Sequence, residues 1–471
     1  MLIGRKEELK TLRQAVKSDE SKFVAVYERR RVGKTFLVRE AFDNDFAFYH
    51  TGLADESNRV QLSEFNRSLS LYGKKKKTKL NDWYDAFAEL GRLLEQSAMQ
   101  KKVVFIDEMP WMDSPRSSFL SSLEHFWNGW ASARKDILLI VCGSATSWII
   151  NKVIKNHGGL HNRVSVRIHL KPFCLKECEL YAHELGLHFS RRQVLEGCMI
   201  MGGIPFYWSQ MKAGMSLAQN VNQLFFSEDG ALCHEFDDLY DSLFKQPKPY
   251  LAIVDALAIK KVGMTRTEIL QETGLADNGK LTECLENLEY CGFIRKYNCI
   301  GMKAKNALFQ LMDNYTLFYY KFIKGYYIND AQYWTKTLGK PEYNTWCGLA
   351  FERVCLQHVE QIKTKLGIQG VITTVYSWSV AGTKEVAGAQ IDLLIDRSDD
   401  VVNLCEIKYA KGQYQITHAV DANLQNKRER FVQETGTSKA VYLTMITTMG
   451  LLENSYAWDV QSVVTMDDLF V

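Results

Sequence analysis

Proline and long apolar runs are both scarce in this chain of 471 residues, which has only 7 prolines although 46% of its residues are hydrophobic. No apolar run approaches the roughly 18 residues that a membrane-spanning helix needs. The opening MLIGRKEELK is too charged for a secretion signal. These absences argue against a disordered chain and against an integral membrane protein. We therefore expect a folded, cytoplasmic protein that has no membrane partner.

An excess of either charge is missing too, because 58 Lys and Arg residues stand against 55 Asp and Glu residues. Any nucleic-acid surface must therefore be a local patch. The 11 cysteines are scattered and odd in number, which is typical of reduced core thiols. Cys174 and Cys178 are close at helical spacing, but without a second Cys or His pair nearby they do not predict a metal site.

The strongest motif lies in VAVYERRRVGKTFLVREAF, Val24 to Phe42, which predicts a short strand, a tight loop and a helix opening at Gly33-Lys34-Thr35. In such a loop, backbone N–H groups hold phosphate oxygens, the lysine reaches the β- and γ-phosphates, and the hydroxyl takes Mg²⁺. The full pattern G-x-x-x-x-G-K-[ST] has glycine where this chain has Glu28. We expect the added charge and Cβ to weaken the site. An ordinary strand-to-helix turn is the alternative.

Two further apolar strands end in polar residues. The run Lys102 to Ile106 leads to Asp107-Glu108, which predicts that Asp107 holds Mg²⁺ through water and that Glu108 orients and polarises the attacking water. The run Ile137 to Cys142 delivers Ser144 to the same sheet edge. Ser144 would sense the γ-phosphate or the water, or would only cap the next helix. The three segments together predict an ATP site.

The other N-terminal elements are predicted from apolar periodicity. They are a strand at Phe46–Tyr49, helices at Trp83–Leu94 and Phe119–Trp130, and an alternating strand at Asn162–Ile168. The lysine run Lys74 to Lys77 is expected to be a solvated loop, with a role in nucleic-acid binding as the alternative.

Three segments together resemble the archaeal-type ATPase family, an AAA+-like group of P-loop NTPases that is also found in bacteria. They are Ile3-Gly4-Arg5, Arg30 to Thr35, and Phe105-Ile106-Asp107-Glu108. The resemblance implies a set of nucleotide-binding residues, of which Thr35 and Asp107 serve the metal: Gly4, Arg5, Arg31, Val32, Gly33, Lys34, Thr35 and Asp107. It also implies catalytic roles for Glu108 and Ser144.

The same resemblance implies two further features. Arg163 is a candidate finger that acts in trans on a neighbouring copy, with an ordinary surface arginine as the alternative. Helical patterns at Leu175–Leu185 and Arg191–Met201, closed by Gly202-Gly203-Ile204-Pro205, resemble the small helical lid of AAA+ proteins. In that lid the turn falls beside the nucleotide.

The middle of the chain predicts a winged helix. Pro247 and Pro249 indicate a linker, and three helices follow, at Tyr250–Ile259, Thr267–Thr273 and Lys280–Tyr290. Gly292-Phe293-Ile294 would begin the hairpin. Lys280 would lie on the recognition helix of a DNA-binding domain. The acids on that helix favour the alternative, a protein-contact module: Glu283, Glu286 and Glu289.

The last part of the chain carries a second group of charged residues. The aromatic helix Tyr315–Tyr326 is expected to be a core connector, and Gly348–Val359 a helix that bears Glu352. Asp392 lies in one predicted strand, and the next strand, Val402–Lys408, places Glu406 and Lys408 on one face because side chains alternate with period two.

Metal-dependent phosphodiester cleavage uses carboxylates that hold a divalent metal ion and a lysine that steadies the attacking hydroxide. Asp392 followed by Glu406-x-Lys408, with Glu352 upstream and Gln425 on a later helix, resembles the PD-(D/E)XK nuclease fold. A domain of this kind commonly follows archaeal-type ATPases. Asp392 and Glu406 are thus candidate ligands of Mg²⁺ or Mn²⁺, and exposed strand residues with a cross-strand ion pair are the alternative.

The predicted fold is α/β: an AAA+-like parallel sheet with a helical lid, then a winged helix, then an α/β nuclease-like domain. The predicted bounds are 1–170 for the ATPase core, 171–245 for the lid, 246–312 for the winged helix, 313–345 for a connector and 346–471 for the nuclease-like domain. The predicted function is Mg²⁺-dependent ATP binding and hydrolysis, with DNA, a second copy or a protein as partner. There are two alternatives. One is a nucleotide-dependent switch or scaffold that does not hydrolyse ATP, and the other is a DNA-processing enzyme whose chemistry lies entirely in the C-terminal domain.

Overall fold

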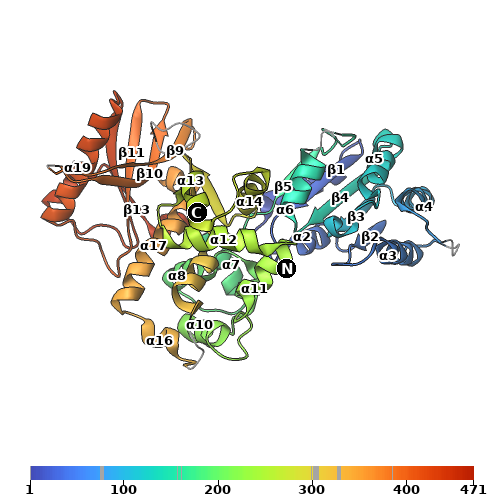
Figure 1. Ribbon diagram of the computed structural model, residues 1–471, viewed down its shortest axis with the longest axis horizontal. Helices are drawn as coiled ribbons and strands as arrows, with labels where there is room; N and C mark the ends of the chain where they lie inside the picture. The colour runs from blue at the N-terminus through green and yellow to red at the C-terminus, as the bar shows by residue number, and fades with distance from the viewer. Residues whose placement is uncertain are drawn as a thin grey trace. The chain divides into compact units, whose positions relative to one another are not determined.

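The computed structural model describes residues 2–74, 79–155, 158–160, 162–298, 300, 307–325, 330–384 and 386–471. Lys75 to Lys77 of the lysine run and Tyr326 of the aromatic stripe lie outside these ranges. By contacts the chain divides into two compact units (Figure 1). Unit 1 comprises residues 1–172 and 241–245, and unit 2 comprises residues 173–240 and 246–471. Each unit is described by itself.

Unit 1 is built on a five-stranded sheet with the order β2-β3-β4-β1-β5, in which every neighbouring pair is parallel. All residues of β3 and β4 are buried, as expected for inner strands of a parallel sheet that is covered on both faces. The strands are β1 (Lys22–Tyr27), β2 (Phe48–Thr51), β3 (Lys102–Asp107), β4 (Ile137–Gly143) and β5 (Val166–His169).

Helices connect and cover these strands (Figure 1). They are α1 (Lys6–Val16), α2 (Lys34–Ala41), α3 (Asn58–Leu71), α4 (Trp83–Gln96), α5 (Phe119–Gly129) and the short α6 (Thr146–Trp148), together with the 3₁₀ turns η1 (Met109–Met112) and η2 (Ala131–Ala133) and the π-helical turn η3 (Ile149–Ile154). Asp82 caps α4 and Ser57 caps α3, each through a side-chain oxygen that accepts a backbone N–H.

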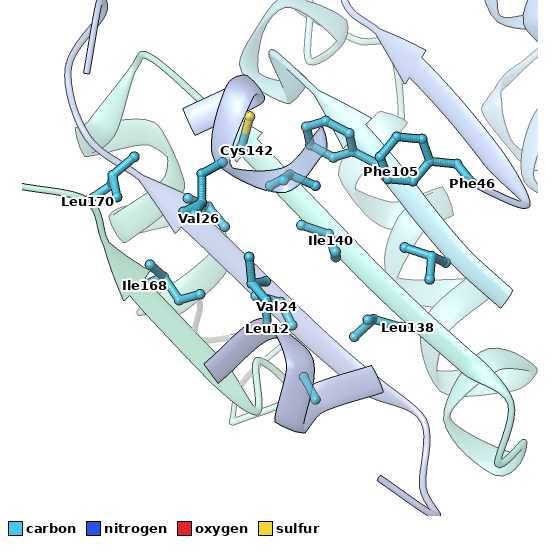
Figure 2. Packing of buried hydrophobic residues seen from close by; sticks show 14 residues of the cluster. Leu12, Val24, Val26, Phe46, Phe105, Leu138, Ile140, Cys142, Ile168 and Leu170 are labelled. Atoms are coloured by element: carbon cyan, nitrogen blue, oxygen red, sulfur yellow. The ribbon is translucent and has the colours of Figure 1, made fainter. Parts of the chain in front are cut away.

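The core beneath α1 and α2 joins strands that are distant in the sequence. Figure 2 shows Val24 and Val26 of β1 beside Ile140 and Cys142 of β4, with Phe105 of β3 near them. All five side chains are fully buried. Apolar burial of this extent, at about 25 cal/mol per Å² removed from water, is the main term that holds the carboxyl ends of the strands in place.

Two predicted strands are wrong in their bounds. β2 begins at Phe48 rather than Phe46 and continues through Thr51, and the apolar pair Phe46-Ala47 is buried just ahead of the strand. β5 begins at Val166 rather than Asn162. Asn162 has a φ of 55°, in the left-handed region that a strand cannot contain, and the next residue, Arg163, donates its N–H to the Leu160 carbonyl in a turn.

Unit 2 begins with helices that include those expected as a lid. They are α7 (Leu175–Glu184), α8 (Arg191–Met201), α9 (Pro205–Ser209), α10 (Leu217–Phe225) and α11 (Glu235–Leu243), whose last residues belong to unit 1. Gly203 must be glycine, because a Cβ there would lie 1.9 Å from the Phe173 carbonyl oxygen. By contacts these residues group with the rest of unit 2, and their role as a lid stays a prediction.

Three helices and a small sheet follow. The helices are α12 (Pro247–Ile259), α13 (Arg266–Thr273) and α14 (Gly279–Tyr290), and the antiparallel sheet has the order β6-β8-β7, with β6 (Met264–Thr265), β7 (Ile294–Tyr297) and β8 (Leu308–Leu311). Pro247 and Pro249 were expected in a linker, but they lie in the first turn of α12. A first-turn proline loses no intrahelical hydrogen bond, which is why the helix can include them.

The aromatic connector is shorter than expected and changes its helical form. It consists of α15 (Asn314–Phe318) and the π-helical turn η5 (Tyr319–Ile323), followed by α16 (Tyr333–Thr337). Phe318 and Phe322 are buried and pack edge-on against Trp334. These residues are core, as the sequence predicted.

The chain ends in a five-stranded mixed sheet with the order β13-β12-β11-β10-β9. β10 is antiparallel to both of its neighbours, β9 and β11, while β12 and β13 run parallel to β11. The elements are α17 (Pro341–Gln357), α18 (Val359–Lys365), β9 (Thr373–Val380), β10 (Ala389–Arg397), β11 (Val401–Lys408), α19 (His418–Thr435), β12 (Ala440–Thr447), η6 (Ser455–Asp459), β13 (Ser462–Thr465) and η7 (Met466–Leu469). In the described part of the chain, no helix is both long and apolar enough to cross a bilayer.

Candidate functional site

The loop after β1 turns sharply into α2. Arg31 and Gly33 both have left-handed backbones, with φ values of 74° and 92°, and Val32 between them is buried. Gly33 is the N-cap of α2 and offers no side-chain cap to the helix. The first-turn N–H groups therefore lack a side-chain acceptor from the cap residue, which is the arrangement that suits an incoming anion.

Lys34 lies inside this loop. Its side chain is buried, and Nζ donates to the carbonyl oxygens of Glu28 and Arg29 at 2.6 and 2.8 Å. Both acceptors are neutral carbonyls, so the positive charge of Nζ is not cancelled by these contacts. A phosphate oxygen would compete well for this ammonium, because a charge-assisted hydrogen bond is roughly twice as strong as a neutral one.

The two predicted metal residues of the ATPase core lie together. The Thr35 hydroxyl donates to Asp107 Oδ2 at 2.7 Å, although the residues are 72 positions apart. Asp107 Oδ1 accepts the Glu108 N–H at 2.9 Å and also the Cys142 thiol. Hydroxyl and carboxylate oxygens are the donors that Mg²⁺ prefers, so this pair fits the ion that the sequence predicts.

Cys142 is a neighbour that the sequence did not predict. Burial raises the pKa of its thiol well above the usual value, and the Asp107 carboxylate adds to the rise. The thiol therefore stays protonated and acts as a donor, which orients one carboxylate oxygen of Asp107. The only signal for this contact is the place of Cys142 next to the end of a buried strand.

Glu108 and Ser144 also meet. Glu108 Oε2 accepts the Ser144 hydroxyl at 2.9 Å and the Ser144 N–H at 3.1 Å. The N-cap of the next helix is Ala145, without a side-chain cap, so the alternative role of Ser144 as a helix cap is wrong. The hydroxyl instead fixes the carboxylate that was predicted to polarise water, next to Asp107.

A tight approach between two elements holds Glu108 in place. Glu108 has a left-handed φ of 46° and begins the turn η1. A Cβ on Gly143, at the end of β4, would lie 2.4 Å from Pro110 Cδ. Since real Cβ atoms do not approach so closely, glycine is required for η1 to pack against β4 and bring Glu108 to Ser144.

Glu28 is occupied by partners of its own. One carboxylate oxygen accepts the Arg29 N–H at 2.7 Å, and the other lies 2.6 Å from His169 Nε2 on β5. The Glu28 side chain is only 4% exposed, and the His169 ring stacks on Tyr27 with centroids 5.0 Å apart. Glu28 is also absent from the described residues with positive φ, so a Cβ at this position carries no backbone strain.

The remaining predicted residues of unit 1 lie in two places. Gly4 and Arg5 are consecutive left-handed residues ahead of α1, and Arg5 is buried with Nη1 3.7 Å from Glu8 Oε1. Arg163 is exposed in the turn before β5. That turn adjoins the amino end of β5, whereas Asp107 is the last residue of β3 and Glu108 follows it, at the carboxyl end. The role of Arg163 as a finger that acts in trans stays a prediction.

In unit 2, Glu406 and Lys408 do share one face of β11, as period two predicted. Lys408 Nζ lies 2.8 Å from Glu406 Oε1, and Lys427 of α19, which the sequence did not predict, lies 2.6 Å from Oε2. Burial opposes the ionisation of Glu406, but Lys427 and Lys408 outweigh it and hold the pKa of this carboxyl below its usual value. Both carboxylate oxygens thus pair with ammonium groups.

The two other predicted acids of unit 2 have separate partners. Glu352 pairs with Arg353 at 2.6 Å, while burial raises the pKa of Glu352 and the Asp392 carboxylate adds to the rise. Asp392 accepts a hydrogen bond from Gln390 at 2.7 Å and lies within a β-bulge of β10. In the antiparallel register of β10 and β11, Leu393 pairs with Cys405. Asp392 precedes Leu393 and Glu406 follows Cys405, so both acids lie just beyond this pair, at the same end of it.

No group of three or more His, Cys, Asp and Glu side chains converges as metal ligands in the part of the chain that the structure describes. The ten cysteines in this part are all free thiols, in agreement with the expectation of reduced core cysteines. The metal site predicted for unit 2 therefore rests on two acids alone, Asp392 and Glu406.

Comparisons with known proteins found one family model and several similar proteins. Residues 2–207 match a family model described as an ATPase domain predominantly from Archaea. An uncharacterized protein of Methanocaldococcus jannaschii is 25% identical over 367 residues, which cover 77% of this chain and 78% of that protein.

Two solved structures are similar at low identity. The Walker-type ATPase of Pyrococcus abyssi is 17% identical with a TM-score of 0.48, and the match covers 67% of this chain and 95% of that one. The ORC2 protein of Aeropyrum pernix is 12% identical with a TM-score of 0.41, over 76% of this chain and 95% of that one. Residues 2–207 are thus similar to an ATPase domain of archaeal type, and the parallel α/β sheet with the loop at Lys34 agrees with a P-loop ATPase fold.

Proposed function

We propose that this protein binds ATP with Mg²⁺ at the carboxyl edge of the unit 1 sheet and hydrolyses it. The observation that supports this most directly is the 2.7 Å contact between Thr35 and Asp107, because it joins the two residues that would hold the ion. Lys34 would leave the loop carbonyls for the β- and γ-phosphates. Bound Mg²⁺ would neutralise charge on the phosphate oxygens.

Glu108 is the proposed catalytic base. Its carboxylate accepts two hydrogen bonds from Ser144, which fix its orientation and leave its second oxygen, Oε1, for the attacking water. Gly4, Arg5, Arg31 and Val32 would complete the nucleotide pocket as the resemblance implies. Arg163 would serve only a neighbouring copy, so a homo-oligomer is part of this proposal.

The direct test of binding is Lys34→Ala, measured by titration of a fluorescent ATP analogue in the presence of Mg²⁺. We expect at least a hundredfold loss of affinity, because backbone groups alone cannot replace the ammonium charge at the β- and γ-oxygens. Lys10→Ala, at an exposed lysine of α1, is the matched control and should bind as the parent does. Equal affinity of the Lys34 variant and the parent would contradict the proposal.

A second proposal concerns the target. The three helices with the β7–β8 hairpin have the element order of a winged helix, and α17 with β9 to β13 has that of a PD-(D/E)XK nuclease. DNA is the target that both would serve. On α14, however, Glu283 and Glu286 are exposed and repel phosphate, which favours a protein partner for that helix.

Cleavage is tested with the double variant Asp392→Ala/Lys408→Ala and Mn²⁺, on DNA and on RNA. If the domain cuts, Lys427 must release Glu406, and the double variant should lose at least a hundredfold in rate while ATP binding is unchanged. If the parent protein neither cleaves nucleic acid nor shows a Mn²⁺-induced thermal shift, the proposal of cleavage is contradicted, and this domain resembles nucleases in structure alone. The ATPase would then act as a switch or scaffold for protein partners.

A further inference from the structure

The peptide unit that joins Glu28 to Arg29 is held at both of its polar ends. Its carbonyl oxygen, which belongs to Glu28, accepts Lys34 Nζ at 2.6 Å, and its N–H group, which belongs to Arg29, donates to Glu28 Oε1 at 2.7 Å. A peptide unit is planar, so fixing the N–H also fixes the direction of the carbonyl. The Glu28 carboxylate therefore helps to set where the Lys34 ammonium rests.

The carboxylate is in turn held by His169. Glu28 Oε2 lies 2.6 Å from His169 Nε2, and because an ionised carboxylate only accepts hydrogen bonds, Nε2 is the donor. Two contacts aim the His169 ring. Tyr27 pairs with His169 in the register of β1 and β5, and the two rings stack with an interplanar angle of 5°. His169 is thus fixed by a strand and by a ring, and its donor faces Glu28.

Burial makes this contact important to Glu28. The Glu28 side chain is only 4% exposed, whereas that of His169 is 38% exposed. A carboxylate that is withdrawn from water needs a partner for each oxygen, and Glu28 has the Arg29 N–H for Oε1 and His169 for Oε2. Without His169, Oε2 would be a buried anionic oxygen that has lost its donor, and the carboxylate would turn toward water or toward a cation.

Lys34 is within reach of a displaced Glu28 carboxylate. Its Nζ already donates to the backbone carbonyl of Glu28 and to that of Arg29, at 2.6 and 2.8 Å, and both acceptors are neutral. The carboxylate would replace them, because a charge-assisted hydrogen bond is roughly twice as strong as a neutral one. Lys34 would then have to leave an ion pair before it reached a phosphate, and its positive charge would already be balanced.

We propose that His169 is a positioning residue for ATP binding, which holds the Glu28 carboxylate toward β5 and so keeps Lys34 available to the phosphates. The inference rests on the function proposed above and adds a residue that the sequence did not predict. Since His169 acts through Glu28, its loss changes the affinity for ATP and leaves the rate of hydrolysis at saturating ATP near that of the parent. Glu28 is then compatible with nucleotide binding because β5 supplies a donor for its carboxylate.

A double-mutant cycle with His169→Leu and Glu28→Gln tests the proposal, with affinities for a fluorescent ATP analogue measured in Mg²⁺. We expect His169→Leu to weaken binding at least tenfold, with hydrolysis at saturating ATP within threefold of the parent rate. His169→Gln keeps an N–H donor and should bind within threefold of the parent. Glu28→Gln keeps an acceptor for the Arg29 N–H but has no charge to pair with Lys34, so adding it to His169→Leu should restore parent-like binding.

The matched control is His188→Leu, at an exposed histidine in the loop between α7 and α8, which should bind as the parent does. A parent that does not bind the analogue would contradict the proposed function and this inference with it. If the parent binds, equal affinity of His169→Leu and the parent would overturn the inference alone. An equal loss in His169→Leu, His169→Gln and the double variant would also overturn it, because the ring would then serve only to pack on Tyr27. His169→Asn, whose shorter side chain does not reach Glu28, takes the place of a leucine variant that fails to fold.

Discussion

At the scale of single residues, the interpretation of the phosphate-binding loop depends on Glu28. From the sequence, its charge and Cβ were expected to weaken the site. In the structure its two carboxylate oxygens face the Arg29 N–H and His169, and its backbone is unstrained. We infer that Glu28 supports the loop from inside, as part of a loop that has adapted to the absence of glycine.

Replacing Glu28 by glycine should therefore harm the loop rather than repair it. The Glu28→Gly variant loses an acceptor for a buried N–H and gains backbone freedom, a destabilisation of about 1–3 kcal/mol. We expect a melting temperature several degrees lower and an ATP affinity no higher than that of the parent. Asp19→Gly, at an exposed loop position, is the control for added flexibility. Tighter ATP binding by the Glu28 variant would restore the interpretation of a weakened site.

Local patterns predicted the residues of the site but not their partners. Lys34, Thr35, Asp107 and Glu108 each follow a motif within a few positions. The contacts of His169 with Glu28 and of Lys427 with Glu406 span 141 and 21 positions, because they depend on which strands and helices become neighbours. No periodicity within a single segment carries that information.

At the scale of elements, the site depends on how η1 packs against the end of β4. The predicted test is Gly143→Ala, whose new Cβ would lie 2.4 and 2.6 Å from atoms of the rigid Pro110 ring. The turn must then move and take Glu108 away from Ser144. We expect at least a tenfold loss in the rate of ATP hydrolysis, with a smaller effect on nucleotide affinity, which depends on Lys34.

The control for this variant is Gly129→Ala at the end of α5, where a Cβ meets nothing within 4 Å. Alanine there removes backbone freedom from the unfolded chain and should be neutral or slightly stabilising. Hydrolysis by Gly143→Ala at the rate of the Gly129→Ala control would show that the packing of η1 on β4 does not position Glu108.

Elements with strong periodicity were predicted with nearly the right bounds, as α4, α7, α8 and β4 show. The errors have local physical causes. Pro247 was placed in a linker because proline usually ends helices, yet the first turn accepts it. The strand β2 was placed two residues early because Phe46 and Ala47 are buried without belonging to the strand.

At the scale of the whole molecule, the contacts give two compact units where the sequence predicted five segments. The ATPase motifs and their geometry all lie in unit 1, whereas the helices expected as a lid lie in unit 2 with the C-terminal sheet. Composition shifts and glycine or proline signals suggest boundaries, but they cannot show which neighbouring segments share one core. The five predicted bounds therefore stay predictions.

The most direct test of the central claim is the steady-state rate of Mg²⁺-dependent ATP hydrolysis by the parent and by Glu108→Gln. A glutamine still accepts from Ser144 but cannot polarise water, so we expect hydrolysis to fall at least a hundredfold while ATP binding is retained. Glu56→Gln, at an exposed loop position, should hydrolyse ATP as the parent does. Parent-level hydrolysis by Glu108→Gln, or a parent whose rate does not exceed that of Lys34→Ala, would contradict the account.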